Sequence, residues 1–277
     1  MRRWDDASTF EGIDMRTSKL AFAAATLLGL GLGTSPAFAD ETDPPKDFTF
    51  SGYVQGVSDY RFRGYSLSGG DPAVQGTINV NHSSGFYAGA WASSLDGNGP
   101  VLGFYGDVEL DLYAGWTGSV AKGLTADVGV LRYVYPSNDG QGPADFWEPY
   151  ASLSTTIGPV GAKVGANYAP SQDATLNDDN IYVYGELSGG IPQTPISLSA
   201  HLGYTDGPLG PKFLAFNSND KSGFDYSAGV TWNVTDKLSV SATYVGSDAH
   251  SSEAAYDAGL SGVVANDTVV GTIKLAL

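Results

Sequence analysis

The sequence predicts an all-β fold: a transmembrane, antiparallel, up-and-down β-barrel of about twelve strands. Three observations predict it. Polar and apolar residues alternate through most of the chain, which places them on opposite faces of β-strands. Most alternating stretches run for about 10 to 14 residues, longer than typical strands and long enough to cross a bilayer at a tilt. Short turns alternate strictly with long polar loops, as in a barrel whose two rims differ.

The clearest alternation lies in residues 103–118, GFYGDVELDLYAGWTG. Asp107, Glu109 and Asp111 share one parity, whereas valine, leucine, alanine and tryptophan occupy the other. Carboxylates so closely spaced cannot face a packed core without partners, so their face must be wet. In a soluble sandwich this pattern would be an ordinary half-buried strand. In a barrel it is a strand with an apolar outer face and a polar inner face.

The expected elements follow one another in a regular order. Strands are expected near 47–60, 72–82, 86–94, 103–118, 124–135, 145–157, 160–169, 179–190, 196–205, 222–234, 238–247 and 266–277. Short turns are expected at the periplasmic rim, at 83–85, 121–123, 158–159, 192–195 and 235–237. Long loops are expected at the outer rim, at 61–71, 95–102, 136–144, 170–178, 206–221 and 248–265.

Aromatic residues near strand ends support the membrane interpretation, because such rings favour the membrane–water boundary. Those expected on the apolar parity, in two girdles, are Trp91, Trp116, Trp147, Tyr168, Tyr204, Phe224, Trp232 and Tyr244.

The N-terminal region predicts export. Residues 15–39 fit a signal peptide, with a positive start, an apolar segment and an Ala-Phe-Ala cleavage site at 37–39. Residues 1–14 are interpreted as an extension from an upstream start codon. Residues 40–46 are then a periplasmic lead-in, and 47–277 the outer-membrane barrel.

Composition excludes several classes of protein and site. The chain has 277 residues, a formal net charge of −16 and no cysteine. The negative charge argues against a nucleic-acid partner, because phosphates would be repelled. Without cysteine, neither a disulfide framework nor a cysteine metal site can form. Only 16% of residues are charged, fewer than the roughly 25% of typical soluble domains.

Several segments resemble the TorF family of porin-like outer-membrane proteins. They are 58–64 (SDYRFRG), 84–89 (SGFYAG), 91–93 (WAS), 109–116, and Arg132-Tyr133 with Tyr135-Pro136. The resemblance covers most of the mature chain and implies a bacterial outer-membrane β-barrel with a pore function. It implies no particular substrate and no catalytic residue. One departure is Leu277 at the end, where many such barrels carry an aromatic residue that the barrel-assembly machinery reads.

The polar parity supplies candidate pore-lining residues. Its acids are Asp107, Glu109, Asp111, Asp127, Glu148, Glu186 and Asp225, and its bases are Lys163 and Lys274. An excess of carboxylates favours cations, although paired acids and bases that plug a narrow barrel remain an alternative. Arg61, Arg63 and Arg132 are candidates for a constriction or for loop contacts with lipopolysaccharide phosphate or loop carboxylates.

The favoured function is therefore passive diffusion of small solutes through a cation-leaning outer-membrane channel. The first alternative is a plugged structural or adhesive barrel without conductance. His82 and Ser84 also invite comparison with the lipid-facing dyad of outer-membrane phospholipase A. They lie at a short turn without a third residue to orient the imidazole, so no enzyme is predicted. Expected partners are outer-membrane lipid, lipopolysaccharide, small solutes or ions and the assembly machinery, with no cofactor or metal.

Overall fold

The computed structural model describes residues 47–97, 105–138, 142–216, 219–249 and 265–277. The predicted extension, signal peptide and lead-in lie outside the described residues, as does most of the loop at 248–265.

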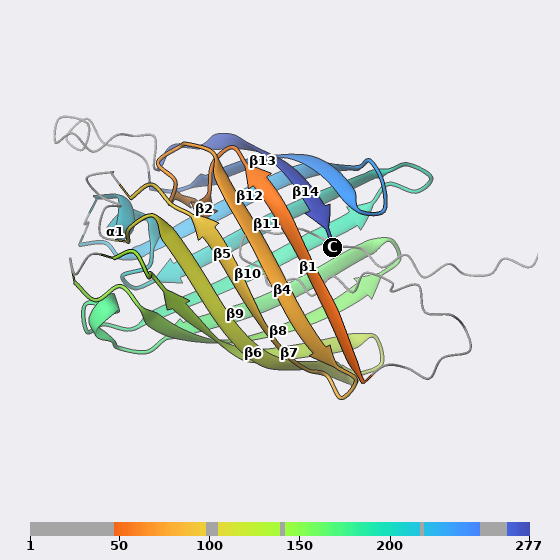
Figure 1. The fold of residues 1–277 in the computed structure, drawn as a ribbon, viewed down its shortest axis with the longest axis horizontal. Helices are drawn as coiled ribbons and strands as arrows, with labels where there is room; N and C mark the ends of the chain where they lie inside the picture. The colour runs from red at the N-terminus through yellow and green to blue at the C-terminus, as the bar shows by residue number, and fades with distance from the viewer. Residues whose placement is uncertain (1–46, 98–104, 139–141, 217–218, 250–264) are drawn as a thin grey trace, which may run out of the picture.

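Twelve antiparallel strands close into a barrel (Figure 1). They are β1 (Phe48–Val57), β4 (Ala73–His82), β5 (Phe86–Ser94), β6 (Val108–Ala121), β7 (Leu124–Val134), β8 (Phe146–Ile157), β9 (Val160–Ala169), β10 (Asn180–Gly190), β11 (Ile196–Asp206), β12 (Ser222–Asn233), β13 (Leu238–Ser247) and β14 (Thr268–Ala276). Each strand pairs with its neighbours along the chain, and β1 pairs with β14 to close the barrel. The predicted fold is thus confirmed.

The connections also match the predicted rhythm. The long ones carry β2 (Arg61–Phe62), β3 (Tyr65–Ser66), the 3-10 helix η1 (Asp173–Thr175) and α1 (Pro211–Phe216). In the described part of the chain, no helix has the length and hydropathy of a membrane span. The main differences are that the first strand ends at Val57 and that β6 begins at Val108 and continues to Ala121.

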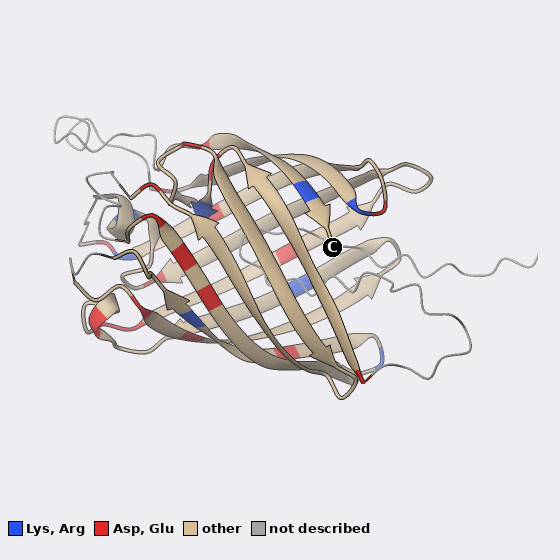
Figure 2. Cartoon of the chain, in the orientation of Figure 1, with Lys and Arg blue, Asp and Glu red and all other residues tan. Residues whose placement is uncertain are grey.

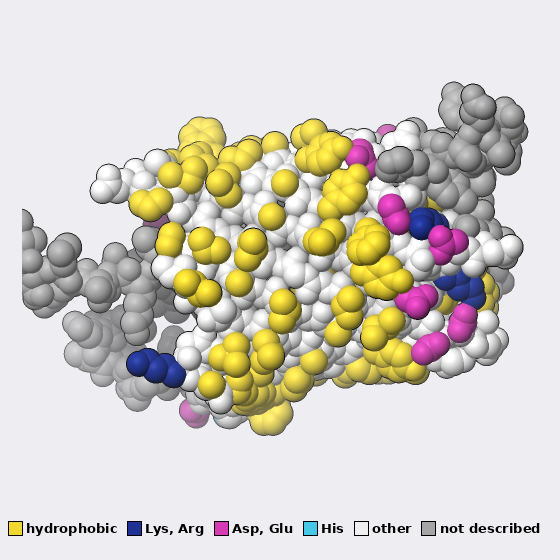
Figure 3. Space-filling view, turned by 180° about the vertical axis from the view of Figure 1, so that it is seen from behind, with side chains coloured by type: hydrophobic (Ala, Val, Ile, Leu, Met, Phe, Trp, Pro, Cys, Tyr) yellow, Lys and Arg dark blue, Asp and Glu magenta, His cyan; other side chains and the backbone are white. Residues whose placement is uncertain are grey.

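The alternation produces an apolar outer surface, because large hydrophobic side chains on one parity of every strand point away from the lumen. Phe50 is 73% exposed and Val164 is 60% exposed, and similar residues recur on the other strands. Figure 3 shows this yellow belt, with charged side chains gathered beyond it towards the end that bears the long loops. Figure 2 shows few charged residues elsewhere on the strands.

One aromatic assignment was wrong. Trp91 is only 8% exposed and belongs to the inward parity of β5, directly opposite Asp111 of β6. Its ring packs on Tyr60 with centroids 5.4 Å apart, inside the barrel. The outward-facing positions of this strand are occupied by alanines at 88, 90 and 92. The direction of the Trp91 side chain therefore follows its position in the alternation and not its hydropathy.

Glycines on the inner face accommodate tyrosine rings from the neighbouring strand. Gly129 pairs with Tyr150, and Gly165 pairs with Tyr184. A Cβ atom added to Gly129 would lie 2.4 Å from the Tyr150 hydroxyl, and one added to Gly165 would lie 2.4 Å from Tyr184 Cζ. These rings therefore lie flat against the wall, in space that a side chain would otherwise fill.

Candidate functional site

The candidate site is built around the first long connection, which folds into the barrel. Residues 59–68, here called the inner hairpin, are buried throughout. Their side chains reach inward-facing residues of four strands: Tyr60 packs on Trp91, Phe62 on Tyr133, and Arg63 contacts β8 and β10. A segment that touches so many inner faces of a barrel lies in its lumen.

A tight turn aims the tip of the inner hairpin. Phe62 pairs with Tyr65 across the two-residue turn Arg63-Gly64. Both turn residues have positive φ, 47° at Arg63 and 79° at Gly64, as a two-residue type I′ hairpin turn requires. Positive φ is uncommon for a residue other than glycine. The conformational cost of a positive φ at Arg63 is offset by the buried ion pair that its side chain forms with Glu148.

The base of the inner hairpin is held by a second arginine. Arg61 Nε donates to Asp59 Oδ2 at 2.5 Å, and the Ser66 hydroxyl donates to Asp59 Oδ1 at 2.6 Å. Arg61 Nη1 also donates to the Asn266 carbonyl at 2.9 Å, next to the start of β14. These bonds fix the base of the inner hairpin to itself and to Asn266, next to the start of β14.

The tip makes the central ion pair of the lumen. Arg63 Nη2 lies 2.6 Å from Glu148 Oε1, and both side chains are almost completely buried. The Tyr133 hydroxyl and the Asn167 amide donate to Glu148 Oε2 at 3.1 and 3.0 Å. The guanidinium also lies 4.2 Å from the ring centroid of Tyr182. Charge-assisted bonds of this kind are the stronger hydrogen bonds of proteins.

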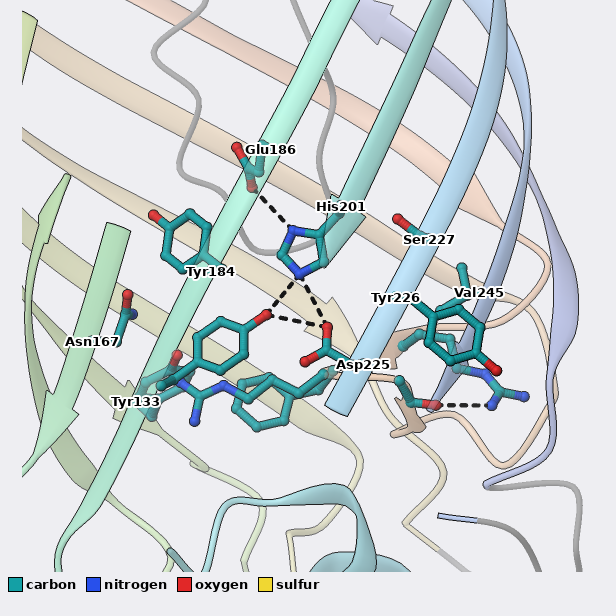
Figure 4. A pocket seen from close by; sticks show the side chains of 14 residues that line it. Tyr133, Asn167, Tyr184, Glu186, His201, Asp225, Tyr226, Ser227 and Val245 are labelled. Carbon is teal, nitrogen blue, oxygen red and sulfur yellow. Dashed lines mark hydrogen bonds and ion pairs between the residues drawn. The ribbon is translucent and has the colours of Figure 1, made fainter. Parts of the chain in front are cut away.

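Next to this ion pair, residues of β9 to β12 form a continuous polar chain, whose members on β10, β11 and β12 are drawn in Figure 4. His201 Nε2 lies 3.0 Å from Asp225 Oδ1 and 2.7 Å from the Tyr182 hydroxyl. On its other side, His201 Nδ1 lies 3.5 Å from Glu186 Oε1, and Glu186 Oε2 lies 3.8 Å from Lys163 Nζ. His201 of β11 thus lies between two carboxylates, one on each neighbouring strand.

A small cavity separates the inner hairpin from this wall. Its volume is about 30 Å³, and its lining includes Arg63, Asn167, Tyr184, Glu186 and Ser227. A polar space of this size holds about two ordered waters. The lumen at the level of the hairpin is therefore narrow, and its lining carries both signs of charge.

The acids of β6 lie on a different wall. Glu109 is 0% exposed and Asp111 is 2% exposed, beneath the hairpin residue Tyr60 and beside Tyr135. Asp107 does not join them, because it precedes the strand and is exposed, with its backbone amide bonded to Ser137. Of the three acids that were predicted to share the inner face, two therefore lie inside the barrel.

The remaining candidates are distributed around the barrel. Asp127 accepts a hydrogen bond from the Tyr87 hydroxyl at 2.5 Å, and Lys274 Nζ lies 4.0 Å from the Tyr53 ring centroid. Arg132 has the outward parity of β7. It pairs with the loop residue Asp145 at 3.1 Å and lies over Trp147, so it belongs to the outer surface near the long-loop rim.

The pair His82 and Ser84 has the geometry of a capped turn. The Ser84 hydroxyl lies 2.7 Å from His82 Nδ1, and the Ser84 backbone amide donates to the same nitrogen at 3.2 Å. His82 ends β4 and Ser84 lies in the turn that follows, on the short-turn rim. This arrangement ties the imidazole into the local backbone.

Sequence reasoning missed the inward fold of residues 59–68 and the roles of Asp59, Tyr133 and Tyr182. One signal was present. Arg63-Gly64 between two aromatic residues fits a two-residue hairpin turn, but the pattern does not tell whether the hairpin points outward or into the lumen.

Comparisons with known proteins agree with this architecture. The Gcw_chp family model, described as a bacterial protein of unknown function, matches residues 41–276. That family has a different name from TorF, so the TorF resemblance stays a prediction.

A comparison with curated proteins finds no match. Among solved structures, the chain is similar to the NanC porin, with 11% identity and a TM-score of 0.54, covering 81% of this chain and 98% of that one. It is also similar to the KdgM porin in complex with disordered oligogalacturonate, with 6% identity, a TM-score of 0.51 and coverage of 82% and 98%. At such identities the likeness concerns the fold.

Proposed function

We propose that this chain, which belongs to the Gcw_chp family of bacterial proteins, is an outer-membrane channel for passive diffusion of small solutes. The observation that carries the proposal is the contrast between the two faces of one closed sheet. The outer face is apolar around the barrel, whereas the inner face carries ion pairs, hydroxyls and a polar cavity. A closed sheet with an apolar outer face and a polar interior is the architecture of outer-membrane barrels, porins among them.

The same contrast supports the proposed location and partners. The apolar belt is suited to outer-membrane lipid, and Arg132 near the long-loop rim to lipopolysaccharide phosphate. Export through the predicted signal peptide at 15–39 and insertion by the barrel-assembly machinery belong to this proposal.

We propose that the channel leans towards cations. Seven carboxylates project into the lumen or from the inner hairpin, against two arginines and two lysines. The acids are Asp59, Glu109, Asp111, Asp127, Glu148, Glu186 and Asp225, and the bases are Arg61, Arg63, Lys163 and Lys274. Excess luminal carboxylate favours cations. The solutes proposed for this channel are therefore neutral or cationic, in contrast to oligogalacturonate, the polyanion in the complex of the KdgM porin.

A second function, a plugged structural barrel, is favoured by one specific observation. The tip of the inner hairpin is fixed by the buried Arg63–Glu148 pair at 2.6 Å, and the cavity beside it has space for only about two waters. If the hairpin never moves, little besides water passes.

Single-channel conductance in planar bilayers tests both functions. The full chain is compared with a variant in which residues 61–66 are replaced by a short Gly-Ser linker. We expect a small, cation-selective conductance from the wild type and a several-fold larger one from the variant. Conductance from the variant alone would favour the plugged barrel, and silence from both folded proteins would overturn the channel.

A further inference from the structure

The acids of β6 pose a problem of unpartnered buried oxygens. Within the described residues, Glu109 Oε1, Glu109 Oε2 and Asp111 Oδ1 are buried without a hydrogen-bond partner. The Tyr60 hydroxyl, from the inner hairpin, is also buried without one, and it lies beside the Glu109 carboxyl. Tyr60 is 1% exposed. Such groups are rare in native proteins, and each calls for a specific explanation.

We propose that Glu109, Asp111 and Tyr60 form a buried site for a divalent, oxygen-preferring cation such as Ca²⁺. The site goes beyond solute passage, because it joins the inner hairpin to the barrel wall and is covered by the hairpin itself.

The charge that remains on the two carboxyls distinguishes a divalent cation from a shared proton. Ionised carboxylates only accept hydrogen bonds. One proton shared between the two carboxyls, with the Tyr60 hydroxyl donating to the third oxygen, leaves one negative charge buried, whereas a divalent cation balances both carboxylates. A cation takes lone pairs from the oxygens of both at once, together with the phenol oxygen.

Charge and geometry indicate the class of cation. Two ionised carboxylates balance one divalent ion, and the residues offer up to five oxygen ligands, four from the carboxyls and one from the phenol. Calcium takes six to eight oxygens in flexible geometry, whereas magnesium demands a near-ideal octahedron and keeps several waters. The donor set, with no nitrogen or sulfur, therefore favours Ca²⁺.

Terbium luminescence can test the site, because Tb³⁺ replaces Ca²⁺ and emits when a nearby tryptophan is excited. Trp91 is the direct cross-strand partner of Asp111, and its ring packs on Tyr60. In the full chain refolded in detergent, we expect tryptophan-sensitised Tb³⁺ emission that Ca²⁺ displaces. The double variant Glu109→Gln with Asp111→Asn should weaken this binding at least tenfold, and Tyr60→Phe, which keeps the ring, severalfold.

Asp127→Asn is the matched control, since this luminal carboxylate already accepts a hydrogen bond from the Tyr87 hydroxyl. Replacing the Asp127 carboxylate should leave the Tb³⁺ signal unchanged. Heat-modifiable migration in gel electrophoresis verifies folding, and if the double variant does not fold, Tyr60→Phe decides. The proposal is overturned if the wild type shows no Ca²⁺-displaceable emission, if the folded double variant keeps it, or if Tyr60→Phe binds as tightly as the wild type. Binding is measured without conductance, so this result is independent of the channel test.

Discussion

The inner hairpin touches two walls of the lumen that differ in how their acids are partnered. On the paired wall, β8 to β12, Glu148 bonds Arg63, Glu186 lies beside Lys163, and Asp225 lies beside His201. On the unpaired wall, β5 and β6, the acids are Glu109 and Asp111, whose buried oxygens lack hydrogen-bond partners within the described residues.

The difference shows that a buried acid has no fixed effect on stability. A buried ion pair is costly to break because the remaining charge loses its partner. A buried charge without a partner already bears that cost, so its removal relieves the fold unless a ligand compensates it. The paired wall therefore holds the inner hairpin by itself, whereas the unpaired wall needs a cation or a proton to do so.

The largest expected effect is on the paired wall. Arg63→Met leaves Glu148 buried without its cation and should lower the free energy of unfolding by about 3–5 kcal/mol. Urea titration of the refolded protein in detergent measures it. The matched variant, Arg63→Met with Glu148→Met, removes both charges and should recover most of the loss. Equal stability of wild type and single variant would show that the pair does not hold the hairpin.

The two walls should next respond with opposite signs to the same substitution. In Ca²⁺-free buffer, Glu109→Gln should raise the free energy of unfolding by about 1–3 kcal/mol, because it removes a buried ionisable group without a partner and its amide can donate to Asp111. Glu148→Gln should lower it by a similar amount, because it removes the partner of Arg63. The same urea titration compares them. A loss of stability in both variants would contradict the claim that the acids of the two walls differ in how they are partnered.

The strands of the barrel could be predicted from the sequence, whereas the partners of the acids in the lumen could not. Strict alternation within 103–118 and alternation in eleven other stretches predicted the strands, because one side of a barrel strand faces lipid and the other faces the lumen. The prediction for Trp91 was wrong because it rested on the apolar ring, whereas the alternation along β5 directs this side chain into the lumen. The burial of Glu109 depends on Tyr60, which is distant in sequence and reaches it only because the inner hairpin folds inward. No local pattern encodes that direction.

Ring packing on the paired wall gives a smaller, steric test. Gly165→Ala places a methyl group 2.4 Å from Tyr184 Cζ and should cost about 1–3 kcal/mol, the usual effect of overpacking. Gly185→Ala on the adjacent strand is the control, since its nearest atom, the Lys163 carbonyl oxygen, is 4.0 Å away. Urea titration should show a loss for the first variant alone. Equal effects would mean that the ring moves aside freely.

The smallest effect is expected outside the barrel, at the pair formed by exposed Asp220 and half-buried Lys212. The Ser222 hydroxyl donates to Asp220 at 2.7 Å and Lys212 Nζ lies at 3.0 Å. The serine first and then the lysine lower the pKa of Asp220 to about 2. A lowered carboxyl pKa stabilises the fold above the ordinary pKa of 3.8, and this contribution is lost as pH falls through about 2.

Solvent screens this pair, in contrast to the buried pair at Arg63. Asp220→Asn should therefore leave the urea midpoint almost unchanged at pH 7, and any difference from wild type should vanish towards pH 2 and shrink in high salt. The control is Asp236→Asn in a short turn, for which no comparable partner is found among the described residues. If Asp220→Asn destabilised the protein as much as Arg63→Met, exposure would not separate rim pairs from luminal ones, and the strength assigned to the paired wall would lose its basis.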